Sequence, residues 1–232
     1  MNPLRTRVGR NSIGATARLV PTITILLLLA ICLPEATTAQ DDPLFTRLDS
    51  AESGITFANH VIEDEIFNIN TFIYAYNGGG TAAGDIDGDG LIDLFFTGTQ
   101  GHTPNRLYRN LGNMRFEDIT ERAGVGDTND VRYGTSMVDI DADGDLDIYV
   151  NKQHTPNSLY INDGSGRFTE EAARFGLDHC CSSNQTSFFD YDRDGDLDLY
   201  LLTNRAFSGD MWAVPGKVLE RVRIPAGTQQ TL

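Results

Sequence analysis

Hydrophobic residues along the chain gather in short runs between small and polar segments, a pattern typical of strands rather than helices. Three runs rich in aromatic and aliphatic residues are predicted to be buried strands: 94–98, 148–151 and 199–202. Each run is preceded, across an acidic stretch, by another short segment of small and β-prone residues: 79–84, 133–138 and 184–189. The pattern therefore predicts three hairpins, each with an acidic connection.

A second element recurs between these hairpins. The segment "NRLYRNLGNMRFEDITERAGV" (105–125) aligns with "NSLYINDGSGRFTEEAARFGL" (157–177), and each predicts a strand, a Gly-bearing turn and a closing segment. The closing segments begin at Phe116 and Phe168, and residues 44–59 resemble the same closing part. A period of about 50 residues with about four strands is typical of β-propeller blades. We therefore expect an all-β fold with two complete and two partial blades, forming an incomplete propeller.

The acidic connections share one motif, D-x-D-x-D-G-x-x-D. It occurs as "DIDGDGLID" (85–93), "DIDADGDLD" (139–147) and "DYDRDGDLD" (190–198). Carboxylates crowded in this way repel one another unless a cation lies between them. Calcium takes six to eight oxygen ligands, and a glycine at position 6 allows the tight turn that such a loop needs. Three repetitions of the motif therefore predict about three calcium sites.

The predicted ligands are the side chains at positions 1, 3, 5 and 9 of each loop and the backbone carbonyl at position 7. In the first loop they are Asp85, Asp87, Asp89, Leu91 and Asp93. In the second they are Asp139, Asp141, Asp143, Asp145 and Asp147. In the third they are Asp190, Asp192, Asp194, Asp196 and Asp198.

Other metal-binding loops fit this pattern less well. An EF-hand carries a bidentate Glu at position 12 between two helices, whereas position 12 here is Phe96, Val150 or Leu201 in a predicted strand. The same strands argue against a dockerin-like module. Magnesium prefers a rigid octahedron and keeps several waters. Zinc and copper are disfavoured because no His or Cys accompanies the aspartates.

The N-terminal residues have the composition of a secretory signal. Arginines precede an apolar stretch (22–32) that is too short to span a bilayer, and small residues follow it up to Ala39. We therefore expect residues 1–39 to be a signal peptide cleaved after Ala39, and the protein to be secreted, periplasmic or on the cell surface. Acylation of Cys32 as a lipoprotein is the alternative, although Ile31 stands where a small residue is expected.

The chain is acidic. Its formal net charge is −15, and since residues 1–39 hold four Arg and one Glu, the remainder carries −18. Such a charge repels nucleic acid and anionic membranes. Neither is expected as a partner, and no transmembrane span is expected after signal removal.

Two further motifs favour structural interpretations. Cys180 and Cys181 are adjacent, and because the ring formed by neighbouring half-cystines is strained, we expect them not to pair. The glycine-rich segment "NGGGTAAGD" (77–85) lacks the Lys-Ser/Thr ending of a phosphate-binding loop and leads into an acidic loop. Close packing of strands explains its glycines better.

The combination of D-x-D-x-D-G-x-x-D loops with "N-x-L-Y-x-N-x-G-x-x-x-F" segments resembles the FG-GAP (VCBS-type) repeats of exported β-propellers. It is most similar to the group that includes cartilage acidic protein and bacterial proteins with an ASPIC/UnbV domain. The resemblance spans residues 44–203 and implies that the loop aspartates bind calcium at blade edges. The group's C-terminal ASPIC/UnbV segment has no counterpart here, and 203–232 is expected to be the start of a further repeat or an irregular tail, in a truncated chain.

The sequence therefore predicts an exported, non-catalytic propeller over residues 40–202, whose loops are structured by calcium. By resemblance, its faces would bind a surface protein or a polysaccharide. The alternative is a fragment of an extracellular hydrolase whose catalytic residues lie in other blades.

Overall fold

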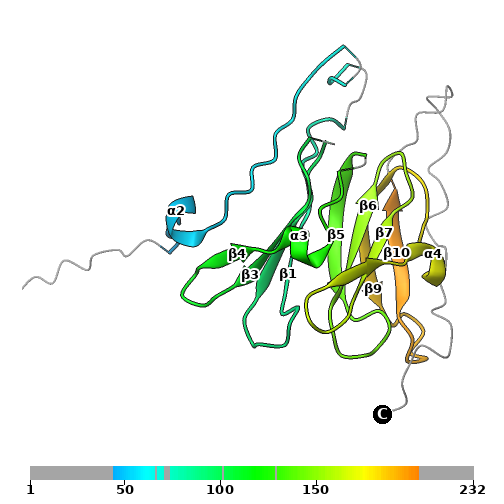
Figure 1. Cartoon of the computed structure of the whole chain (residues 1–232). Helices are drawn as coiled ribbons and strands as arrows, with labels where there is room; N and C mark the ends of the chain where they lie inside the picture. Colours follow the sequence, from blue (N-terminus) through cyan, green and yellow to red (C-terminus); the bar gives the residue numbers. More distant parts are fainter. Residues whose placement is uncertain (1–43, 66, 71–73, 101, 129, 204–232) are drawn as a thin grey trace, which may run out of the picture. The chain divides into compact units, whose positions relative to one another are not determined.

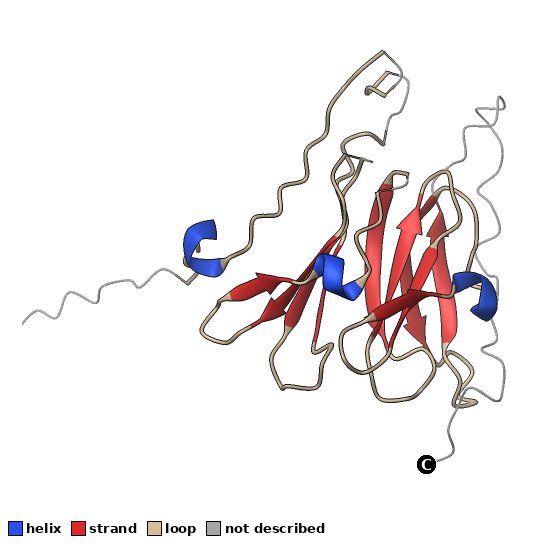
Figure 2. Ribbon diagram, in the orientation of Figure 1, coloured by secondary structure: helices blue, strands red, loops and turns tan. Residues whose placement is uncertain are grey.

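The computed structural model describes residues 44–203, except 66, 71–73, 101 and 129. The signal peptide predicted for residues 1–39 and the segment 204–232 lie outside the described residues. Antiparallel sheets dominate the described part, and its helices are single turns (Figures 1 and 2). The sheets belong to one compact unit that begins at Arg47.

Two four-stranded sheets follow each other along the chain, each with its strands in sequence order. The first consists of β1 (Thr81–Gly84), β2 (Asp93–Phe96), β3 (Arg106–Asn110) and β4 (Phe116–Asp118). The second consists of β5 (Arg132–Val138), β6 (Asp147–Lys152), β7 (Ser158–Asn162) and β8 (Phe168–Glu170). The expected repeat of four antiparallel strands is therefore confirmed in both sheets.

A third sheet holds β9 (Ser183–Phe189) and β10 (Asp198–Thr203), the first two strands of another repeat. One-turn helices end the closing segments: α2 (Ser50–Ser53), α3 (Thr120–Ala123) and α4 (Ala172–Phe175). Each is capped by a left-handed glycine whose N–H returns to the first helical residue. Since α2 shares this cap with α3 and α4, residues 44–59 do resemble the end of a repeat.

The hydrophobic core lies between successive sheets. Strand β6 is buried along its whole length, and its alternating side chains enter two different clusters. Ile148 and Val150 pack with Phe95 and Leu107 of the first sheet, whereas Tyr149 packs with Leu199 of the third. Because successive side chains of a strand point to opposite faces, the second sheet is buried on both faces by its two neighbours.

Glycines allow the first strands of neighbouring repeats to approach closely. A Cβ atom on Gly80 would lie 2.6 Å from the carbonyl oxygen of Tyr133, and one on Gly134 would lie 2.6 Å from that of Asn184. Strands β1 and β5, and β5 and β9, are in contact at these places. The packing role predicted for the glycines of segment 77–85 is therefore confirmed for Gly79, Gly80 and Gly84, whereas Gly78, with a φ angle of 82°, meets no atom within 4 Å.

Replacing Gly80 by Ala should lower the free energy of unfolding by about 1–3 kcal/mol, because backbone atoms of the next repeat must move. Urea unfolding of the full chain, followed by far-ultraviolet circular dichroism, measures this change. Gly126→Ala is the control, since its Cβ would meet only the Thr120 methyl group, at 3.1 Å. Equal stabilities of the two variants would contradict the packing role.

Candidate metal centres

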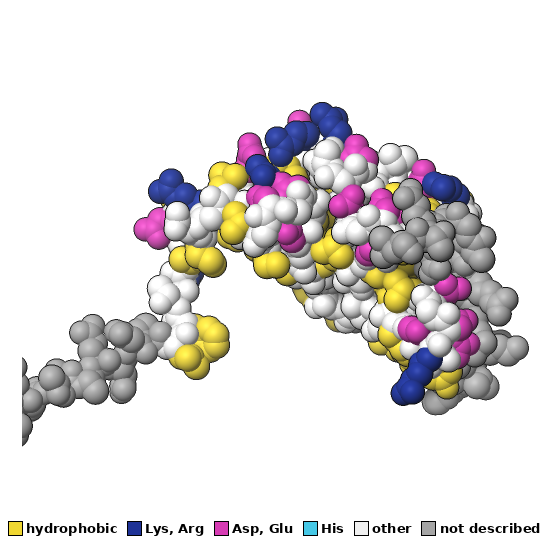
Figure 3. Space-filling model, turned by 90° about the horizontal axis from the view of Figure 1, so that it is seen from below, with side chains coloured by type: hydrophobic (Ala, Val, Ile, Leu, Met, Phe, Trp, Pro, Cys, Tyr) yellow, Lys and Arg dark blue, Asp and Glu magenta, His cyan; other side chains and the backbone are white. Residues whose placement is uncertain are grey.

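The three aspartate-rich loops connect the first and second strands of their sheets: β1 to β2, β5 to β6 and β9 to β10. The predicted position of each motif, between strands and not between helices, is therefore confirmed. Acidic side chains, drawn in magenta, are exposed on the surface shown in Figure 3.

The aspartate at position 1 shapes each loop. Both carboxylate oxygens of Asp85 accept backbone N–H groups, from Asp89 at 3.1 Å and from Gly90 at 2.8 Å. The same pair of bonds forms at Asp139 and at Asp190, with lengths of 3.1–3.2 Å. The glycines at position 6 have φ angles of 84°, 99° and 93°, so their predicted left-handed conformation is confirmed.

A second left-handed residue stands at position 4 of each loop. Gly88, Ala142 and Arg193 have φ angles of 69°, 59° and 62°. This conformation is uncommon for residues that carry a Cβ atom. Its occurrence at Ala142 and Arg193 shows that the backbone of the loop, and not the residue type at position 4, sets the conformation there.

The aspartate at position 9 joins its loop to the third strand of the sheet. Asp93 is fully buried and accepts the N–H of Ile86 at 3.0 Å and that of Asn110 at 2.7 Å. Asp147 accepts the corresponding N–H groups of Ile140 and Asn162 at 2.9 and 2.8 Å. One buried carboxylate therefore fixes the loop, the second strand and the end of the third strand.

Two asparagines at the ends of the third strands complete this arrangement, although no role was predicted for them. The side-chain amide of Asn110 donates to the carbonyl of Ile92 at 2.8 Å. That of Asn162 donates to the carbonyl of Leu146 at 3.2 Å and also to that of Ile86, in the first loop, at 2.8 Å. Their recurrence at the end of each "N-x-L-Y-x-N" motif was the signal that sequence could have used.

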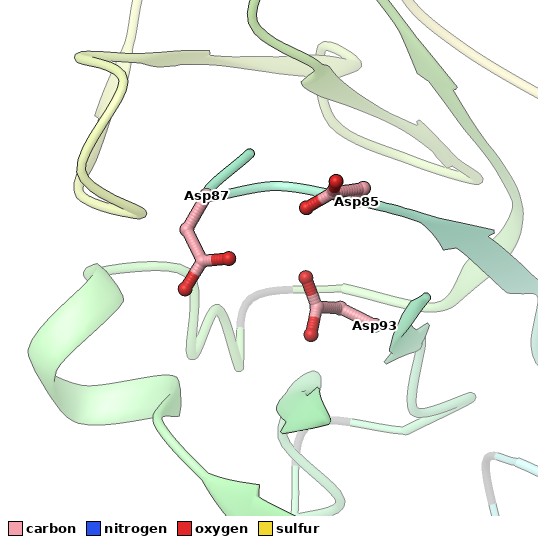
Figure 4. Close-up of side chains that lie close together, drawn as sticks. All are labelled: Asp85, Asp87 and Asp93. Carbon is pink, nitrogen blue, oxygen red and sulfur yellow. The ribbon is translucent and has the colours of Figure 1, made fainter. Parts of the chain in front are cut away.

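Carboxylate oxygens converge in all three loops. Oxygens from Asp85, Asp87 and Asp93 lie within 4.8 Å of one another, and Figure 4 shows these side chains pointing toward a common centre. Equivalent groups form from Asp139, Asp141 and Asp147 and from Asp190, Asp192 and Asp194.

The remaining predicted ligands lie outside these groups. At position 5, Asp89 and Asp143 do not belong to them. The third loop includes its position 5 but not Asp198, which accepts the N–H of Tyr191 at 2.8 Å. In the described residues, no third strand covers this loop, and its grouped aspartates are exposed. The backbone carbonyls of Leu91, Asp145 and Asp196, at position 7, remain predicted ligands.

The electrostatics of the second loop favour a cation. Burial raises the pKa of Asp147 to about 7, and the charges of Asp141 and Asp143 add to the increase, against hydrogen bonds from the backbone of Asn162 and Ile140. The pKa of Asp141 is also raised, first by burial and then by Asp143 and Asp139. A dication among these oxygens would stabilise their charged forms.

The donor atoms fit a hard divalent cation. One carboxylate oxygen at position 3, Oδ1 of Asp87 and of Asp141, is buried without a hydrogen-bond partner. Burial of an unpaired carboxylate oxygen is costly, and the converging groups contain oxygen ligands of the kind that calcium prefers. The residues present are therefore chemically suited to Ca²⁺.

The two cysteines correct a prediction. Cys180 and Cys181 form a disulfide in the structure, so the expectation that these neighbours would not pair is wrong. The peptide bond between them is cis, and their Cα atoms lie 3.2 Å apart. The Cys181 sulfur also lies 3.1 Å from the carbonyl oxygen of His154.

An open groove of about 1320 Å³ lies between the outer parts of the first two repeats. Residues of α3, the start of β7 and the end of β6 contribute to its lining. Lys152 and Asp127 form a largely buried ion pair in it, with Nζ and Oδ2 2.5 Å apart. The groove presents polar groups and both charges, which suits a ligand that forms hydrogen bonds.

Replacing Asp147 by Ala should lower the free energy of unfolding by about 2–5 kcal/mol in excess chelator, because two buried N–H groups lose their acceptor. Glu121→Ala removes an exposed carboxylate of α3 and should change the free energy of unfolding by at most about 0.5 kcal/mol. Urea unfolding measures both. A similar, small effect for the two variants would show that Asp147 does not stabilise the hairpin.

Comparison with known proteins identifies the repeat. The sequence profile of the FG-GAP-like repeat matches residues 85–150 and 139–201, which together make up half of the chain. Human cartilage acidic protein 1 is 30% identical over 130 residues, covering 54% of this chain and 19% of that protein. The Xenopus tropicalis protein of the same name is 30% identical over 139 residues, covering 58% and 21%. The chain thus spans about a fifth of the length of these relatives.

The chain therefore belongs to the FG-GAP-like repeat family, and its four-stranded sheets are β-propeller blades. The resemblance to the cartilage acidic protein group is confirmed, as is the all-β fold of two complete blades with parts of others. No ring of blades closes within the described residues, and none of their helices is long and apolar enough to cross a membrane.

Proposed function

We propose that this FG-GAP-like repeat chain is part of an exported, non-catalytic calcium-binding β-propeller. About three Ca²⁺ ions would structure the hairpin loops of successive blades. The observation that carries the proposal is the buried, unpaired Oδ1 of Asp87 and of Asp141, each in a group of converging carboxylates. A calcium ion would supply the missing partner of these oxygens and offset the repulsion among the charges.

The chain's own residues would hold the ion in a fixed frame. The position 1 aspartate is oriented by two backbone N–H groups, and the position 9 aspartate is oriented by N–H groups from the loop and from the third strand. The position 3 aspartate contributes a further carboxylate oxygen to the converging group. Binding would therefore stabilise the hairpin against opening without requiring a change of fold.

The proposed role outside the loops is the binding of a ligand. We propose that the faces of the propeller bind a surface protein or a polysaccharide, and the polar groove beside Lys152 and Asp127 is a place where such a ligand could form hydrogen bonds. The charge of −15 disfavours nucleic acid. Export agrees with the predicted signal at residues 1–39 and with the millimolar calcium available outside cells.

A fragment of an extracellular hydrolase is the alternative. Such an enzyme needs an acid or base that is not engaged in a metal loop, whereas the regularly spaced aspartates all belong to the three loops. A hydrolytic activity of the full chain on polysaccharide, lost on replacing an acid outside the loops, would favour this alternative.

Calcium should raise the melting temperature of the full chain, and magnesium should raise it less. A site that is filled at a hundredfold excess over its Kd adds about 2.7 kcal/mol to the free energy of unfolding. Asp141→Ala should reduce this calcium-dependent gain. Asp145→Ala is the matched control, because it removes a charge from the same loop while keeping the carbonyl at position 7.

Thermal unfolding followed by circular dichroism, in calcium, magnesium and excess chelator, measures these gains. Equal gains in the two variants would show that the second loop does not hold the ion. A calcium-insensitive melt of the folded wild-type chain would overturn the proposed function.

A further inference from the structure

Loop 1, the segment 85–93, is contacted by a cation from its own chain. Arg109, on β3, donates from Nε to Oδ2 of Asp87 at 2.5 Å and from Nη2 to Oδ2 of Asp89 at 2.9 Å. The guanidinium therefore bridges positions 3 and 5 of the loop. The Arg109 side chain is one-third exposed, so it can leave this position without unfolding the strand.

The two contacts have different consequences for a bound ion. Asp87 keeps its buried Oδ1 free of any hydrogen bond and so can still offer that oxygen to the group of converging carboxylates. Asp89 already accepts the N–H of Leu91 with Oδ1, at 2.9 Å, and Arg109 takes its other oxygen. Arg109 therefore bonds to Oδ2 of Asp89, while Oδ1 accepts the backbone N–H of Leu91.

Loop 2, the segment 139–147, has an apolar residue at the same place. The strand registers match, because Tyr108 pairs with Asp118 as Tyr160 pairs with Glu170, so Ile161 stands where the first blade has Arg109. Among the described residues, no ion pair involves a carboxylate of loop 2. The two loops share the left-handed residues at positions 4 and 6 and the aspartates at positions 1, 3, 5 and 9. They differ in charge at two places: loop 1 has Leu91 where loop 2 has Asp145, and Arg109 where the second blade has Ile161.

We propose that Arg109 is a built-in counter-ion that lowers the affinity of loop 1 for calcium relative to loop 2. An incoming dication meets two units less of negative charge in loop 1, one from Arg109 and one from Leu91 in place of Asp145, and it must share or displace the guanidinium that holds Asp89. The two blades would then load at different calcium concentrations, with loop 2 filling first. This inference rests on the proposed function, because it assumes that the loops bind calcium.

Residue-specific calcium titration of the full chain tests the inference. The backbone N–H signals of Gly90 and Gly144, at position 6 of loops 1 and 2, report each loop separately in ¹H–¹⁵N NMR spectra. In the wild type, Gly144 should reach half-saturation at a lower calcium concentration than Gly90. Arg109→Ile, which copies the second blade, should lower the midpoint of Gly90 about three- to thirtyfold and leave that of Gly144 unchanged.

Two further variants complete the design. Ile161→Arg should raise the midpoint of Gly144 by a similar factor. Arg106→Ile is the charge-matched control, because Arg106 lies on the same strand but pairs with Asp118, outside the loop, at 3.3 Å. It should move neither midpoint by more than about twofold.

The outcomes separate the two proposals. If neither glycine responds to calcium while the spectrum remains that of a folded protein, the proposed function fails and the inference fails with it. If both respond but Arg109→Ile leaves the Gly90 midpoint unchanged or raises it, only the inference fails. In that case Arg109 orients the ligands and does not compete with the ion.

Discussion

The hydrogen bonds accepted by the buried aspartates at the ends of the first two loops are the interaction on which the complete blades depend. Asp93 and Asp147 each accept two backbone N–H groups, one at the start of the loop and one at the end of the third strand. A carboxylate can accept several N–H groups at once, which an amide or hydroxyl oxygen does less strongly. The charge that makes this possible also creates the need for a cation.

The packing of the blades adds a second constraint. A single four-stranded sheet cannot bury both of its faces, and here the alternating side chains of β6 contribute to cores on either side. Since Asn162 also donates to the carbonyl of Ile86 in the preceding loop, the hairpin ends and the cores are linked from blade to blade. The stability of such an array is therefore shared between neighbouring repeats.

Sequence spacing was sufficient to predict the strands, the loops between them and the glycines at position 6, because these follow from local backbone geometry and hydrophobic pattern. It was not sufficient for Arg109 or for the inter-blade bond of Asn162, since both depend on which residues of different strands lie side by side. The left-handed Ala142 and Arg193 were also missed, because residue type gives no sign of that conformation. The pairing of Cys180 with Cys181 was also not predicted from the sequence.

The number of calcium ions bound per chain tests the central claim most directly. Isothermal titration of the chelator-treated full chain with calcium, followed by elemental analysis of the dialysed protein, gives this number. The account predicts about three ions per chain, with magnesium binding more weakly to the same sites. A folded chain that binds no calcium in the millimolar range would contradict it.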